Sequence, residues 1–199
     1  WQGDKNEISL IHKFRLNEFN IGGVWTRATR YVFNLQSGWP RGHQAGTVMA
    51  MAALGDPQKY HEDFFKMLTV DNFPATQKPP GQPRGANVGT DPNHPYLHRF
   101  REIADSGEQE RYDLAAGLQS ATERMFKDLI CNLHSHVPFK NLCLSGGVAL
   151  NSVMVGKIRS WVPEIENIYV TPVPHDGGLT LGACQYVYHQ ILGNPRIAW

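Results

Sequence analysis

The sequence predicts an α/β fold that is rich in helix and has a small sheet, and two observations support it. A short apolar strand, a glycine turn and a helix follow one another twice between Asn141 and Leu192. Upstream of Asn141, apolar side chains recur at three- and four-residue steps, as they do on the buried face of a helix. Strands that alternate with helices are typical of a parallel sheet covered by those helices.

Composition and charge narrow the class of protein. Of the 199 residues, 41% are hydrophobic and 19% are charged, which is typical of one soluble globular domain. The net charge is +1 and no Lys/Arg cluster stands out, so we expect no nucleic-acid partner. The three cysteines form no C-x-x-C pair, which indicates a reducing compartment without disulfides. We find neither an apolar run of about 18 residues nor a signal-peptide pattern, and we therefore expect a cytoplasmic protein without membrane contact.

A strand and three helices are expected in the first third of the chain. Residues 7–19 alternate apolar and polar side chains as a strand does, and so little chain precedes them that we expect partner strands to be missing. Small residues and glycines mark the helices that follow. These helices are expected at residues 24–36 after Gly22 and Gly23, at residues 45–55 with Gly55 at the end, and at residues 57–68.

A long loop and a long helix are expected in the middle of the chain. Residues 70–95 are dense in Pro and Gly, so they predict a loop that is either functional, as a lid, or disordered. Ser106 to Gln109 predict a capping box at the start of the longest helix, which Pro138 ends. The buried face of that helix is predicted to carry Leu114, Leu118, Ala121, Met125 and Leu129.

The first glycine turn of the α/β region is a candidate ligand site. Residues 141–145 predict a buried strand, and Ser145-Gly146-Gly147 joins it to a helix over residues 148–161. Two glycines let the backbone turn sharply and approach a ligand closely, and the helix start offers unpaired N–H groups to an anion. Asn151 is expected one turn into the helix, where its amide can donate to and accept from the same ligand. The pattern also fits a tight connection without a ligand, and its spacing matches neither a Walker loop nor G-x-G-x-x-G.

The second glycine turn, His175-Asp176-Gly177-Gly178, lies between a strand predicted at residues 167–173 and a helix predicted at residues 177–192. Ligands of parallel sheets gather outside the carboxyl ends of strands, so we expect both turns to face one crevice. Asp176 would bring a carboxylate to an anion site, which indicates a divalent cation or a hydrogen bond to ribose. Alternatively, Asp176 caps the following helix. His175 is a candidate ligand or base, or is simply exposed.

Other charged residues are weaker candidates. Two arginines of the first helix and two basic residues of the loop can meet an anionic substrate or serve as surface charges. Two histidines four residues apart have the spacing of metal ligands on one helix face, although no Glu stands between them. These residues are Arg27, Arg30, Lys78, Arg84, His94 and His98.

With both turns considered, the sequence resembles a known family. SGGVALN at residues 145–151 and DGG-x-x-LGA at residues 176–183 resemble motifs of the carbamoyltransferases of the nodulation and antibiotic-modifying type. The upstream stretches GGVWTRATRYVFNL and AGTVMAMAALG resemble two helices of that family in order and spacing. SGGVALN is shared with threonylcarbamoyl-transfer enzymes that modify tRNA, whereas YVYHQILGNPR at residues 186–196 favours the carbamoyltransferases.

The resemblance implies a fold, a reaction and a set of site residues. Residues 1–199 would be a single domain fragment, the second half of a nucleotide-binding domain of the actin/sugar-kinase/Hsp70 (RNase H-like) type. Carbamoyl phosphate and ATP would yield a carbamoyl-adenylate, and the carbamoyl group would pass to a hydroxyl of a small-molecule acceptor. The implied nucleotide-binding residues are Ser145, Gly146, Gly147, Asn151 and Gly177, and the implied ligand of a divalent metal, Mg or Fe, is Asp176.

The sequence departs from the family pattern at several points. Residues 44–47 lack the Glu and Lys that usually begin the second helix, and DGG stands where the family has a DAG-type turn. The family's histidine ligands precede the strand that begins this chain, and its C-terminal adenylate-forming domain is absent. We therefore expect a fragment that does not turn over alone. Two alternatives stay open: a threonylcarbamoyl-transfer or sugar-kinase relative, and a non-catalytic nucleotide-binding or assembly subdomain, with a homodimer as one form of assembly.

Overall fold

The computed structural model describes residues 1–4, 7–13, 21–36, 44–68 and 95–195. Within these ranges the chain is helix-rich with a small parallel sheet, which confirms the predicted α/β class. Among the described helices, none is both long and apolar enough to cross a membrane.

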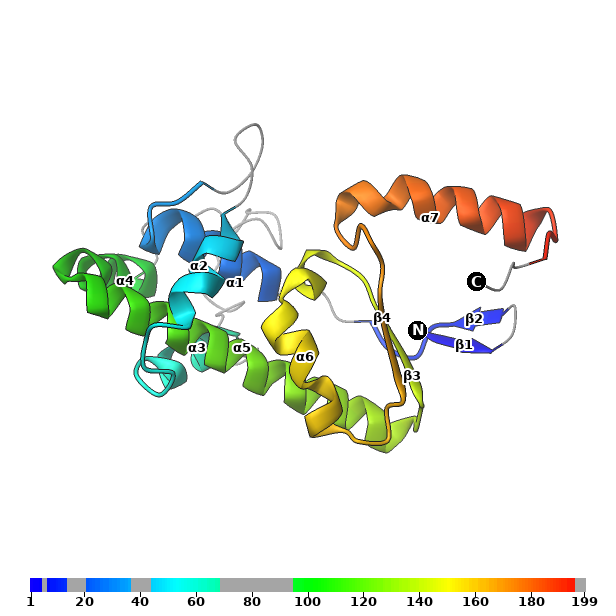
Figure 1. The fold of residues 1–199 in the computed structure, drawn as a ribbon, viewed down its shortest axis with the longest axis horizontal. Helices are drawn as coiled ribbons and strands as arrows, with labels where there is room; N and C mark the ends of the chain where they lie inside the picture. The colour runs from blue at the N-terminus through cyan, green and yellow to red at the C-terminus, as the bar shows by residue number, and fades with distance from the viewer. Residues whose placement is uncertain (5–6, 14–20, 37–43, 69–94, 196–199) are drawn as a thin grey trace, which may run out of the picture.

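After a short hairpin at the N-terminus, helices make up the first part of the molecule, and a long helix runs through it. Figure 1 shows α1 to α4 gathered around one end of α5. The elements are α1 (Ile21–Arg27), the π-helix η1 (Ala28–Val32) that continues it, α2 (Ala45–Ala52), α3 (His61–Leu68), α4 (Pro95–Ser106) and α5 (Glu108–His136).

The second part of the molecule contains the two strand–turn–helix units. Strands β3 (Asn141–Leu144) and β4 (Asn167–Val170) pair in parallel, which confirms the two predicted strands, although each ends before its predicted last residue. The expectation that the first strand is buried was wrong in part, since only Leu142 of β3 is buried. Each strand leads through a short 3₁₀ helix to an α-helix. The helices are η4 (Gly147–Leu150) and α6 (Ser152–Trp161) after β3, then η5 (Asp176–Gly178), α7 (Leu179–Tyr186) and the π-helix η6 (Val187–Ile191) after β4.

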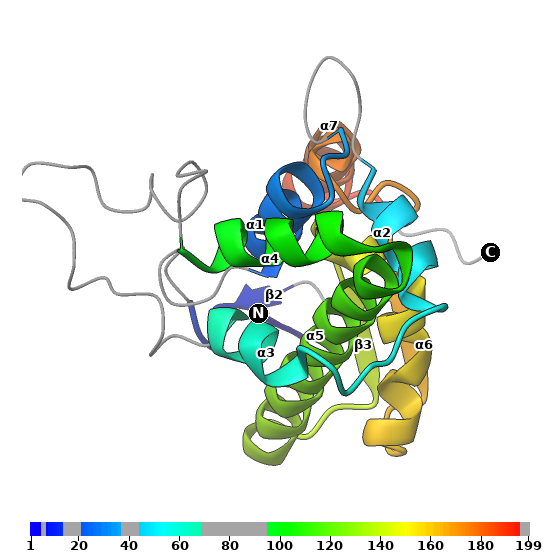
Figure 2. The same cartoon turned by 90° about the vertical axis from the view of Figure 1, so that its left-hand side faces the viewer.

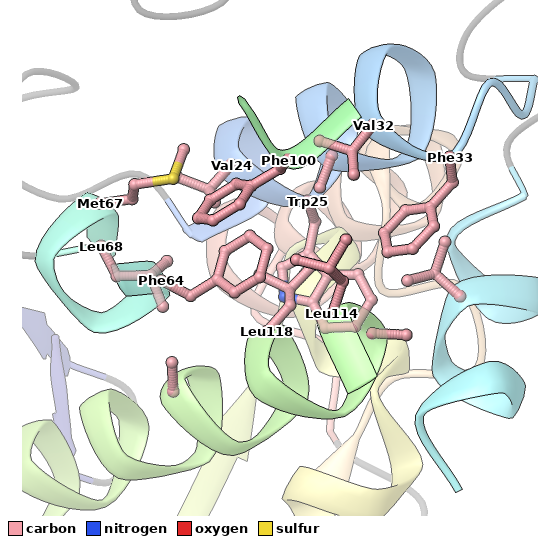
Figure 3. Close-up of a cluster of buried hydrophobic side chains, with 14 of the residues drawn as sticks. Val24, Trp25, Val32, Phe33, Phe64, Met67, Leu68, Phe100, Leu114 and Leu118 are labelled. Atoms are coloured by element: carbon pink, nitrogen blue, oxygen red, sulfur yellow. The ribbon is translucent and has the colours of Figure 1, made fainter. Parts of the chain in front are cut away.

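Two apolar clusters hold the fold together. The larger one joins α1, α3, α4 and α5, and Figure 3 shows Phe64 and Phe100 against Leu118 of α5 at its centre. The rings of Phe64 and Phe100 stack with centroids 4.5 Å apart. The smaller cluster lies between the end of α5, the sheet and α6, and its buried members are Ile130, Leu142, Ile158, Val162 and Ile165. The helix α5 therefore belongs to both clusters and connects the two parts.

The chain before α3 is attached to α5 by a polar network. The Lys59 Nζ atom lies 2.7 Å from Glu110 Oε1 and 3.0 Å from Asp113 Oδ2. The hydrogen bond from Lys59, and a second from Tyr60, lower the pKa of the Glu110 carboxyl. Burial alone would raise the pKa of Asp113, but hydrogen bonds from the Asp56 N–H, Gln109 and Lys59 outweigh it and lower that pKa.

The first strand and the third helix are shorter than predicted. The strand expected over residues 7–19 is β2 (Glu7–Ser9), and residues 10–13 form no strand. β2 pairs antiparallel with β1 (Gln2–Asp4), so the expectation that this strand lacks its partner was wrong for the described residues. The helix expected from residue 57 begins at His61, because Tyr60 has a φ of 62°, which a right-handed helix excludes.

Two further expectations need correction, and a third lies mostly outside the described residues. The helix expected over residues 24–36 runs from Ile21 to Val32. The prediction of a capping box at Ser106 to Gln109 was wrong. Ser106 is the last residue of α4, a helix that was not predicted, and its Oγ donates to the Ile103 carbonyl at 2.7 Å. Most of the loop expected over residues 70–95 lies outside the described residues, as do Lys78, Arg84 and His94.

Candidate functional site

The two glycine turns meet at the carboxyl edge of the sheet. Leu144 and Val170 are paired at the ends of β3 and β4, so both turns leave the sheet at the same edge (Figure 1). The Gly146 N–H donates to the carbonyl oxygen of Pro174 at 2.6 Å, and Ser145 Oγ donates to the same oxygen at 3.4 Å. The turns therefore lie together as expected, while the crevice that they were expected to face stays a prediction.

The first turn is open to solvent. Gly146 has a φ of 96°, a left-handed conformation that side chains oppose, so the sequence needs glycine there. A Cβ atom on Gly147 would meet no other atom within 4 Å, which leaves space beside the backbone. Ser145, Gly146 and Gly147 are all exposed. The N–H groups of Gly147 and Val148 donate to no described residue, so this edge offers two free donors.

The second turn presents an exposed carboxylate. Its cap is His175, whose Nδ1 accepts the Gly177 N–H at 3.1 Å, so the alternative in which Asp176 caps the helix was wrong. Asp176 is exposed, and its side chain makes no hydrogen bond or ion pair with another described residue. A Cβ on Gly178 would lie 2.0 Å from the Val173 carbonyl oxygen, so the turn closes on itself only with glycine there.

Asn151 lies in a different environment from the other candidates. It precedes α6 instead of lying one turn inside it, because the residues before it form the 3₁₀ helix η4. Its side chain is buried, with 5% of the residue surface exposed. Oδ1 accepts from the Met154 N–H and from Gln119 Nε2, both at 3.1 Å, and Nδ2 donates to Gln119 Oε1 at 2.9 Å. These bonds direct the Asn151 amide toward α5.

The weaker candidates lie apart from this edge or are buried. Arg27 is buried in α1, and loss of water lowers the pKa of its guanidinium to about 10, although Tyr31 partly offsets the effect. It is therefore no surface charge. Arg30 is exposed, and its guanidinium lies 5.3 Å from the Tyr31 ring centre. His98 Nδ1 lies 3.3 Å from Glu102 Oε1 on the surface of α4. The described ranges contain no group of three or more His, Cys, Asp or Glu suited to a metal.

Sequence reasoning missed two residues that build the site. Pro174 contributes a backbone carbonyl, which no side-chain pattern can reveal. Gln119, in contrast, left a signal: it stands between Leu118 and Ala121 on the buried face of α5, and a buried amide needs partners. The place of Gln119 on this buried face therefore predicts a polar contact inside the protein.

The fold and the site together define a class of protein. It is a helix-rich α/β protein in which two glycine turns from neighbouring parallel strands are hydrogen-bonded to each other at an open edge. The chain belongs to the family described as carbamoyltransferase N-terminus, whose model matches residues 1–185.

Curated relatives agree with this family. The chain is 31% identical over 154 residues to the nodulation protein NolO of Bradyrhizobium diazoefficiens, which covers 74% of this chain and 25% of that protein. It is 32% identical over 150 residues to the nodulation protein NolNO of Sinorhizobium fredii, which covers 72% of this chain and 20% of that protein. An uncharacterized protein of Synechocystis sp. is 37% identical over 89 residues, 45% of this chain and 14% of that protein. The matches thus span a quarter or less of these relatives, and no solved structure is significantly similar to the chain.

Proposed function

We propose that this chain forms part of an ATP-dependent O-carbamoyltransferase. In the proposed reaction, carbamoyl phosphate, water and ATP give a carbamoyl-adenylate, phosphate and pyrophosphate, and the carbamoyl group then passes to the hydroxyl of a small acceptor with release of AMP. The observation that carries the proposal is the hydrogen bond between Gly146 and Pro174, which brings two glycine turns of a carbamoyltransferase-family chain to one edge. Two such turns give close backbone approach to a phosphate chain from two sides.

Each residue of the edge has a role in this proposal. The free N–H groups of Gly147 and Val148 donate to phosphate oxygens, and Gly146 leaves room for the nucleotide. Gly177 would border the nucleotide from the second turn, where the absence of a Cβ avoids the His175 ring. Ser145 borders the same space. A divalent cation, Mg or Fe, would neutralise phosphate charge. Asp176 fits such a cation because it is an exposed carboxylate oxygen donor without a competing partner among the described residues.

The proposal extends to the fold and to the longer protein. We propose that the sheet and its helices correspond to the second half of an actin/sugar-kinase/Hsp70-type domain, as the family resemblance implies. The nodulation relatives are several times longer than the matched segment, so further polypeptide would complete the cleft and form the adenylate. The acceptor is then a hydroxyl compound bound by that additional part.

Calorimetric titration of the chain with ATP in the presence of MgCl₂ tests the proposal. We expect binding that requires the cation, and we expect Asp176→Asn to weaken it about tenfold or more. Asp128→Asn is the matched control, because it removes an exposed carboxylate of α5, which belongs to neither turn. Its affinity should equal that of the unmodified chain. Absence of binding by the folded chain, or equal losses in both variants, would overturn the assignment of this edge.

A second titration separates the proposed reaction from its alternatives. If the chain serves carbamoyl transfer, carbamoyl phosphate should release or absorb heat on binding at this edge, whether or not ATP is bound at the same time. Titration with Fe(II) in place of Mg²⁺ under anaerobic conditions then identifies the preferred cation. A sugar-kinase relative would instead show no heat with carbamoyl phosphate.

A further inference from the structure

A buried pair of amides connects α5 to the first glycine turn. Gln119 of α5 and Asn151 at the start of α6 exchange two hydrogen bonds, of 3.1 Å and 2.9 Å, over 32 positions of sequence. Both side chains are buried, with 7% and 5% of their residue surface exposed. Buried amides are costly to leave unpaired, so this pair is a strong constraint on where the turn lies relative to α5.

The hydrogen-bond network fixes the orientation of both amides. Asn151 Oδ1 must be the acceptor toward α6, because the Met154 backbone N–H donates to it. The Gln119 NH₂ group donates to Asn151 Oδ1 and also to Glu123 Oε1 at 2.9 Å. A flipped Gln119 would place its carbonyl against the Glu123 carboxylate. The pair therefore has one arrangement, and Gln119 uses both of its donors and its acceptor.

The pair controls one end of the turn that carries the free donors. Asn151 directly follows η4, and its backbone N–H donates to the Val148 carbonyl at 3.0 Å. At the other end of the turn, Gly146 is bonded to Pro174. From the side, Gly22 of α1 packs on Val148, since a Cβ there would lie 3.5 Å from Val148 Cγ2. Loss of the amide pair would release only the end next to Asn151.

We infer that Gln119 is a positioning residue, which acts through Asn151 to hold η4 so that its free N–H groups point to a common ligand. The inference deepens the proposed function and rests on it for the ligand, which is the phosphate chain of a nucleotide. Asn151 then contributes to binding through the backbone that it orients, and Gln119 touches no ligand.

Amide hydrogen exchange combined with ATP–Mg titration tests the inference on the full chain. We compare Gln119→Leu with Thr122→Val as a matched control. Thr122 lies three residues further along α5, is buried, and accepts a hydrogen bond from Trp25 Nε1 at 2.9 Å, but has no bond to the turn. Gln119→Glu is the second variant, since it keeps the shape of the side chain and the acceptor for Asn151 Nδ2.

We expect Gln119→Leu to accelerate exchange of the Ala149 and Asn151 N–H groups about tenfold beyond any change in global stability. Gln119→Glu should accelerate it less, and Thr122→Val should leave it within about twofold. The dissociation constant for ATP–Mg should rise about fivefold or more in Gln119→Leu and stay unchanged in Thr122→Val.

The exchange and binding results test the positioning role of Gln119 separately from the proposed function. Equal exchange in Gln119→Leu and Thr122→Val would overturn the positioning role. Faster exchange with an unchanged dissociation constant would overturn the link between that position and the ligand. If the unmodified chain binds no ATP–Mg, the proposed function fails, while the exchange data still decide whether Gln119 positions the turn.

Discussion

Helices α6 and α7 begin in the same way, yet they differ in what covers them. Both follow a parallel strand and a glycine turn, and both start at the same edge of the sheet. Met154 and Ile158 of α6 are completely buried, whereas α7 and η6 contain no buried residue. Leu179 at the start of α7 is 74% exposed. The same local pattern therefore gives one core helix and one surface helix.

The difference lies in the neighbouring helix. The long helix α5 runs beside α6 and buries it together with the sheet, and the smaller apolar cluster records that contact. Figure 2, a view from the end, shows α6 beside α5 and α7 on the far side of the helical part. Strand–turn–helix sequences thus define where a helix starts, and a covering element decides how much the helix contributes to stability.

Truncation of one buried and one exposed residue should give the largest contrast. We expect Ile158→Ala in α6 to lower the free energy of unfolding by about 3 kcal/mol, because it leaves a cavity beside α5. Leu181→Ala in α7 should change it by less than about 0.5 kcal/mol. Urea unfolding followed by circular dichroism measures both. A similar loss in both variants would show that α7 is packed in solution.

The second-largest contrast in the free energy of unfolding is expected between the residues that cap the two helical segments. Asn151→Ala removes the acceptor for the Met154 N–H and leaves Gln119 half-paired, so we expect a loss of about 2 kcal/mol. His175→Ala removes the exposed cap of η5 and should cost about 0.5 kcal/mol or less. Thermal unfolding of the two variants compares them. Equal losses would mean that the amide pair adds nothing to an ordinary cap.

Glycines inside the two helices offer a smaller test. A Cβ on Gly156 of α6 or on Gly182 of α7 would meet nothing within 4 Å. Alanine favours a helix interior by about 1 kcal/mol over glycine. Gly156→Ala should therefore raise the free energy of global unfolding by about 1 kcal/mol, since α6 unfolds with the core. Gly182→Ala should instead slow only the local amide exchange of α7. A global gain from Gly182→Ala would contradict the separation of the two helices.

Low pH should have the smallest effect on stability, and it should act through the carboxylates of α5 and not through α7. The hydrogen bond from Lys59 lowers the folded pKa of Glu110, so this carboxylate stabilises the fold above its ordinary pKa. That contribution is lost as the pH falls below the ordinary pKa of the carboxyl and through the lower folded value. The urea midpoint should fall over this range, and less steeply in Glu110→Gln. α7 contains no carboxylate, so its amide exchange, corrected for intrinsic rates, should keep the same protection.

The sequence allowed the last third of the fold to be predicted better than the first. Strands and helices after Asn141 follow from apolar runs between glycine turns, and the meeting of the turns follows from parallel strands. The early elements were harder, because single residues end them: the left-handed Tyr60 shifts the start of α3, and Ser106 belongs to the end of α4. Tertiary contacts decide such boundaries, and local patterns do not contain them.

The candidate site shows the same limit. The exposed Ser145, Gly146, Gly147, Asp176 and Gly177 follow from their place after the strands, and the structure brings both turns together. The environment of Asn151 did not follow, because its partner Gln119 lies 32 positions away on another helix. A buried polar residue on an otherwise apolar helix face was the available signal.

The bond between Gly146 and Pro174 joins the two turns through main-chain atoms alone. Replacing the Pro174 side chain leaves the acceptor in place. Any side chain at position 146 would oppose the left-handed φ of 96°, and proline there would also remove the donor. Alanine in place of Pro174 therefore does not test this bond, and alanine in place of Ser145 removes only the longer contact of its Oγ with the same oxygen. Only a backbone change, such as an ester in place of the amide at Gly146, would separate the two turns while preserving every side chain.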